Sequence, residues 1–168
     1  MKAHLNDKFN EGMMAFLGKD YSTCIESLSE VLREDNTHKL ALVSRGAAFL
    51  HTGQTRTALT DFDRALAVDD GYYRAYHLRG LAREIEGDDD GALQDFNKAI
   101  ELAPEYGAAY HSRATLFTKM GQMDQATEDI QMVTQLTQQN IESFANENNV
   151  WRSNHMQVET IMETELNR

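Results

Sequence analysis

Apolar residues recur along this chain in a helical pattern, and the pattern repeats itself after 34 residues. Small residues mark the step most clearly, because Gly12, Gly46, Gly80 and Ala114 stand 34 residues apart. Further columns with the same step are Cys24, Ala58, Ala92 and Ala126, and also Leu28, Phe62, Phe96 and Ile130. The agreement of several columns predicts a stack of equivalent helical units.

Each unit is divided in two by a turn signal. Apolar residues at helical spacing precede and follow this signal, and the spacing predicts two antiparallel helices per unit. The signals are Gly18-Lys19-Asp20, Thr52-Gly53-Gln54, Glu86-Gly87-Asp88 and Met120-Gly121-Gln122. The small residues of the columns would let the paired helices approach closely.

The third unit carries a known set of residues at fixed offsets. They are Tyr76, Gly80, Gly87, Ala92, Phe96, Ala99 and Pro104. In this set the chain resembles the tetratricopeptide repeat (TPR) family. The resemblance implies a single all-α domain, a right-handed α-solenoid of four helix-turn-helix repeats followed by a C-terminal capping or extension helix. We place the repeats at 5–38, 39–72, 73–106 and 107–140, and the last helix at 141–166.

The last predicted helix continues the large-residue pattern of a first helix beyond the fourth repeat. Its stripe includes Phe144, Trp151, Val158 and Met162. The end of a solenoid needs a helix that covers its last apolar face, and the first half of this helix is long enough for that. The second half leaves three alternatives open: capping, a homodimer through the helix, or occupation of the molecule's own groove.

Charged residues keep the period as well. Arg45, Arg79 and Arg113 lie on first helices, at places where the family usually has leucine, and Asp61, Asp95 and Asp129 lie on second helices. We expect a ladder in which the aspartate of one repeat pairs with the arginine of the next, Asp61 with Arg79 and Asp95 with Arg113. Such pairs would fix the register of the stack.

Composition narrows the class of function. The 168 residues carry a net charge of -11, which disfavours nucleic acid and anionic membrane surfaces as partners. No apolar run approaches the roughly 18 residues of a membrane span, so we expect no membrane insertion. Cys24 is the single cysteine, which suits the cytoplasm. We recognise no phosphate-binding loop, metal-ligand motif or nucleophile with its base, and expect a non-enzymatic protein without cofactor or metal.

The resemblance implies that a protein or peptide partner binds the concave wall formed by the first helices. Helical phase predicts that this wall is apolar in three repeats and polar in the fourth, where Ser112, Thr115 and Lys119 also face inward. The predicted groove residues are Phe9, Met13, Phe16, Leu40, Val43, Ala47, Leu50, His51, Arg74, His77, Leu78, Leu81, Ile85 and His111.

One TPR subclass holds a C-terminal carboxylate with lysine, asparagine and arginine side chains. The corresponding places here hold Phe9, Met13, Ser44, Arg74 and Leu78, so we expect that clamp to be absent. The chain is thus interpreted as an interaction adaptor or scaffold that binds a peptide or amphipathic helix. The alternatives are a client-holding chaperone of the acidic TPR-like type and a scaffold that self-assembles through its C-terminal helix.

Overall fold

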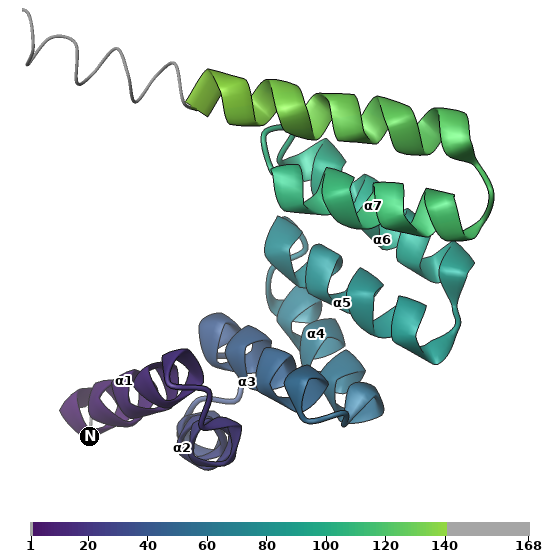
Figure 1. Cartoon of the computed structure of the whole chain (residues 1–168). Coiled ribbons are helices and arrows are strands. Elements are labelled where there is room, and N and C mark those ends of the chain that lie inside the picture. Colours follow the sequence, from purple (N-terminus) through teal and green to yellow (C-terminus); the bar gives the residue numbers. More distant parts are fainter. Residues whose placement is uncertain (1, 141–168) are drawn as a thin grey trace, which may run out of the picture.

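The structure is a computed structural model that describes residues 2–140, and within this range it consists of eight helices without a strand (Figure 1). The eighth helix spans 123–140. The first seven are α1 (Lys2–Leu17), α2 (Tyr21–Glu34), α3 (Lys39–His51), α4 (Thr55–Val68), α5 (Tyr73–Glu86), α6 (Asp89–Leu102) and α7 (Gly107–Lys119).

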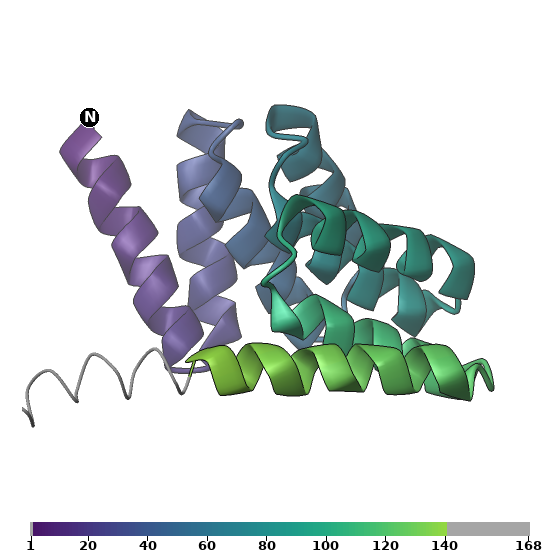
Figure 2. The ribbon, with the colours of Figure 1, turned by 90° about the horizontal axis from the view of Figure 1, so that it is seen from above.

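The helices pair into hairpins that stack in chain order. Helices α1 and α2, α3 and α4, and α5 and α6 contact each other within hairpins, and α2·α3, α4·α5 and α6·α7 join one hairpin to the next. Figure 1 shows the helix spanning 123–140 at the opposite end of the stack from α1, and Figure 2 shows the same helix in front when the stack is seen from above. The all-α solenoid predicted from the repeat is confirmed.

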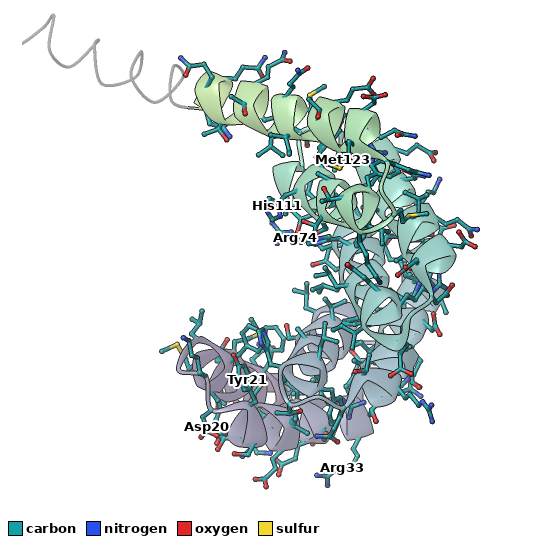
Figure 3. All side chains as sticks on the ribbon, turned by 45° about the vertical axis from the view of Figure 1, so that its right-hand side comes forward. Asp20, Tyr21, Arg33, Arg74, His111 and Met123 are labelled. Carbon is teal, nitrogen blue, oxygen red and sulfur yellow. The ribbon has the colours of Figure 1, made fainter. Side chains whose placement is uncertain are left out.

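The stack is curved, and the first helices line its inner side. Helices α1, α3, α5 and α7 contact their neighbours in this series, whereas no such contact links α2 to α4 or α4 to α6. Figure 3 shows the resulting C shape, with Arg74 and His111 on the inner edge and Arg33 on the outer edge. Side chains of the first helices therefore face a hollow.

Glycine allows the close packing within a hairpin. A Cβ atom built on Gly46 would lie 2.6 Å from the ring of Phe62, and one built on Gly80 would lie 2.6 Å from the ring of Phe96. Both phenylalanine side chains are fully buried. The periodic glycines thus leave, by having no side chain, the space into which the largest core residues pack.

The turn inside each hairpin needs a left-handed residue. Gly87 ends α5 with φ 84°, and its amide donates to the carbonyls of Arg83 and Glu84. The first hairpin has Lys19 there, with φ 61°, a conformation that costs a side-chain-bearing residue more than glycine. Asp88 then caps α6, because its carboxylate accepts a hydrogen bond from the Gly91 amide.

The periodic ion pairs form within repeats, so the predicted ladder between repeats is wrong. Arg79 donates from Nε and Nη2 to Asp95 at 2.9 and 2.7 Å, where the pair Asp61 and Arg79 was expected. Arg113 likewise binds Asp129 in place of Asp95. A hairpin brings a first-helix residue opposite the residue 16 positions later, and this geometry decides the pairing.

Each arginine also reaches back to the preceding repeat. The Nη1 atom of Arg45 donates to Ser29, that of Arg79 to Asp63, and that of Arg113 to Asn97, at 2.6–2.9 Å. The arginine side chain therefore ties its own second helix to that of the preceding repeat. The expected role in register is retained, with different partners.

The predicted C-terminal stripe of Phe144, Trp151, Val158 and Met162 lies outside the described residues. Among the helices of residues 2–140, none is long and apolar enough to cross a membrane.

Candidate functional site

The inner wall holds an apolar groove of about 600 Å³ between α3 and α5, which extends to α7. Both helices contribute residues to its lining. Within each helix these residues are spaced three or four positions apart, which is the spacing of one helix face. The lining residues are Ala47, Leu50, His51, Leu78, Leu81, Glu84, Ile85 and Lys119. The first helices present this face inward because their opposite face packs on the second helices.

Some predicted groove residues lie at this groove and others do not. Ala47, Leu50, His51, Leu78, Leu81 and Ile85 line it, as does Lys119 from the fourth repeat. Val43 and His77 are buried, each with 7% of its surface exposed, so the packing of neighbouring helices withdraws them from an occupant. Helical phase predicts the direction in which a side chain points. It does not predict whether neighbouring helices already bury that side chain.

The remaining predicted residues lie further along the inner helices. The Phe9 ring packs on His38 with centroids 4.8 Å apart, and Met13 is half-buried. Leu40, Arg74 and His111 are exposed, and the Arg74 guanidinium lies over the Tyr73 ring. These residues extend the inner surface beyond the groove.

An aromatic cluster closes one end of the groove. The rings of Tyr21 and His51 are stacked, with centroids 4.8 Å apart and planes 4° apart. Phe16 meets both rings at a steep angle, 5.7 Å from Tyr21 and 5.9 Å from His51. The cluster joins α1, α2 and α3 and holds His51 in place at the groove edge. Tyr21 starts a second helix, so the helical phase of the first helices does not indicate its place beside the groove.

The other end of the groove is charged. The Lys119 ammonium binds Asp89 at 2.6 Å, and Glu84 lies beside this pair in the lining. Burial raises the pKa of the Glu84 carboxyl, and Asp89 raises it further while Lys119 lowers it. Glu84 was missed although it lies three residues after Leu81, a spacing that could have placed it on the same face.

His77 forms a buried polar contact between the third and fourth repeats. Its Nε2 atom lies 2.9 Å from Ser112 Oγ, and its Nδ1 atom lies 3.1 Å from the Tyr106 hydroxyl. Burial lowers the pKa of His77 from 6.5 to about 4, so the ring is neutral at pH 7. One ring nitrogen then donates and the other accepts. The residue therefore belongs to the packing between repeats.

The structure brings no metal-binding group together in residues 2–140. No set of three histidine, cysteine, aspartate or glutamate side chains is placed there to hold an ion. Asp88 and Asp89 begin a run of three aspartates after Gly87, and they have the separate roles already described, helix capping and pairing with Lys119.

Known proteins share both the repeat and the fold. The family model described as tetratricopeptide repeat matches residues 73–106. MamA from Desulfovibrio magneticus RS-1 superposes with a TM-score of 0.74 and 22% identity, over 80% of this chain and 76% of its own. The TPR domain of Arabidopsis OM64 gives 0.67 and 25%, over 70% of this chain and 97% of its own. No curated protein sequence matches the chain significantly.

A further similar structure contains a ligand. The second TPR domain of human RPAP3, in complex with the HSP70 peptide SGPTIEEVD, superposes with a TM-score of 0.65 and 24% identity, over 68% of this chain and 96% of its own. The repeat, the helical hairpins and the likeness to these structures agree. Residues 73–106 match a tetratricopeptide repeat, and the described chain has the fold of the tetratricopeptide repeat structures to which it is similar.

Proposed function

We propose that this protein is a non-enzymatic adaptor that binds a peptide or an amphipathic helix of a partner protein in the groove between α3 and α5. The observation that carries the proposal is the apolar lining that remains open to solvent. Ile85 is 64% exposed at the groove, and Leu50, Leu78 and Leu81 lie beside it. An apolar surface of this kind gains free energy when a partner covers it.

The expected affinity follows from the size of the groove. An occupant that buries three or four apolar side chains gains about 1.5–3 kcal/mol for each. Several kcal/mol of this are lost because the two molecules give up translational, rotational and side-chain freedom. The balance corresponds to roughly micromolar binding, which suits a reversible adaptor.

The RPAP3 complex supports peptide binding by this fold, and the chemistry of the groove here differs from a carboxylate clamp. The peptide bound to that domain ends in Glu-Glu-Val-Asp. Among the clamp places of the present chain, Arg74 is the single cation, and Phe9, Met13 and Leu78 are apolar. An apolar stripe is therefore the better match for this groove than a terminal carboxylate.

We place the protein in the cytoplasm because its single cysteine, Cys24, is buried and has no second cysteine to pair with. A homodimer through the C-terminal helix stays a prediction, since that helix lies outside the described residues.

The test compares two exposed apolar residues near helix ends. Ile85→Asp puts a charge into the groove, and Val68→Asp makes the same change at the end of α4, where Val68 is 46% exposed outside the groove. Peptides selected from a random phage library on the wild-type chain should lose at least tenfold in affinity with I85D and little with V68D. Equal affinities for all three proteins would refute binding in the groove.

A further inference from the structure

Two carboxylates, those of Asp89 and Glu84, lie at the charged end of the groove near a single ammonium group. Lys119 binds Asp89, and Glu84, on the neighbouring α5, lies in the lining beside it. Glu84 makes no ion pair with any residue of 2–140. This end of the groove therefore has one negative charge in excess, at a half-buried position.

The other cations near the end of α5 already have partners. Arg83 pairs with Asp95 at 3.0 Å and lies 3.9 Å from Asp88. Arg56 pairs with Glu86 at 3.4 Å. Neutralising Glu84 from within the described chain would require one of these pairs to break.

The other end of α5 carries a positive charge. Arg74 is exposed near the start of α5, ten residues before Glu84 and therefore roughly 15 Å away along the helix. An occupant of the groove thus contacts an apolar surface that has the negative charge of Glu84 at one end. The positive charge of Arg74 lies outside the groove. The whole chain has a net charge of -11, which adds a long-range attraction for basic partners.

We infer that the groove takes a basic amphipathic segment of a partner protein, whose lysine or arginine at the edge of its apolar stripe pairs with Glu84. The inference rests on the proposed function and specifies the partner's chemistry. Such a cation completes the charge pattern of Glu84, Asp89 and Lys119. Covering the groove would also remove water from Glu84, and a cation in contact with the carboxylate offsets part of the cost of that desolvation.

The chain's own C-terminal residues match this chemistry less well. Residues 141–168 contain five glutamates and two arginines, so this segment has the same sign as Glu84. An acidic occupant would place like charges together in a poorly solvated groove.

The test uses helical peptides of about 18 residues with leucines at i, i+3, i+4 and i+7. Lysine, glutamine or glutamate is placed in turn at each position beside the leucine stripe, so that every register is sampled. Dissociation constants are measured by fluorescence anisotropy with the full chain and with Glu84→Gln. The matched control is Glu101→Gln, which makes the same change on the outer helix α6.

The best lysine peptide should bind roughly tenfold more tightly than its glutamine counterpart, as expected for one charge-assisted pair. E84Q should remove this preference, E101Q should keep it, and Glu84→Lys should transfer it to the glutamate peptide. The preference should also weaken with added salt.

Three outcomes would contradict the inference, and they have different meanings. If peptides bind and I85D abolishes binding, but lysine gives no advantage or its advantage survives E84Q, the inference is wrong and the groove function stands. A preference for glutamate peptides would overturn it in favour of an acidic occupant, the sign of residues 141–168. If no peptide binds, or I85D changes nothing, the groove function fails as well.

Discussion

His77 shows how a single residue can make the stability of this protein depend on pH. Its folded pKa is about 4, against 6.5 for an exposed histidine, because the ring is buried between repeats. The unfolded chain therefore binds more protons between pH 6.5 and 4, and stability falls as the pH drops through this window. We expect a loss of about 1–3 kcal/mol from this residue.

Urea unfolding at pH 7 and pH 4.5 measures this effect. The wild type should lose more stability between the two values than His77→Asn, which keeps a polar side chain that does not titrate. His111→Asn changes an exposed histidine and should behave as the wild type does. An equal loss in the wild type and in H77N would show that His77 is not responsible.

Gly80 predicts a second effect at the scale of one residue. Gly80→Ala would place a Cβ atom 2.6 Å from the Phe96 ring, which cannot move far in a packed core. The strain of about 1–3 kcal/mol should exceed the gain of about 1 kcal/mol that alanine gives in a helix. Gly18→Ala, whose nearest contact would be 3.5 Å, should be neutral or stabilising.

The fourth repeat suggests how the strain could be relieved. At the equivalent places it has Ala114 and Ile130 in place of glycine and phenylalanine. Gly80→Ala should therefore cost less when combined with Phe96→Ile than the sum of the two single changes. Thermal denaturation of the four proteins gives this coupling, and simple additivity would count against the close contact.

At the scale of helices, loss of the arginine should destabilise the protein by different amounts in the different arginine–aspartate pairs. Arg113→Met leaves Asp129 buried without an ion pair, which we expect to cost about 3 kcal/mol. Arg79→Met should cost less, because Arg83 remains 3.0 Å from Asp95. Chemical denaturation measures both, and adding Asp129→Leu to R113M should recover part of the loss. Equal costs for R79M and R113M would contradict this account.

The helices and their order could be predicted from the 34-residue period, because glycine, phenylalanine and turn residues recur together. The partners of the arginines could not. Asp61 lies 18 residues before Arg79 and Asp95 lies 16 residues after it, and a periodic sequence offers both. The choice depends on how the two helices of a hairpin face each other, which requires three-dimensional geometry.

The sequence predicts which side chains point toward the inner wall, and it predicts less well which of them remain exposed there. Leu50, Leu81 and Ile85 could be assigned to the inner face because helical phase carries that information. The burial of His77 could not, since it depends on Tyr106 at the end of the same repeat and on Ser112 of the next repeat, both of which contact the ring. Which inward residues stay open is a property of the stack.

At the scale of the whole molecule, an occupant of the groove would connect hairpins that otherwise touch only their neighbours. The groove draws its lining from α3, α5 and α7, in three different repeats. In a stacked repeat protein, stability is a sum of repeat and interface terms, so a ligand that spans several repeats adds a new interface. Its effect should therefore be felt along the inner wall.

Hydrogen exchange gives the measurement. With the best lysine peptide at 100 times its dissociation constant, the bound chain should be stabilised by about 2.7 kcal/mol against unfolding. Amide exchange should slow in α3, α5 and α7, and the I85D chain should show no change under the same conditions. Protection confined to the outer helices α4 and α6 would place the peptide on the convex side. That result would contradict binding in the groove, and the exposed apolar lining of the inner wall would still lack an explanation.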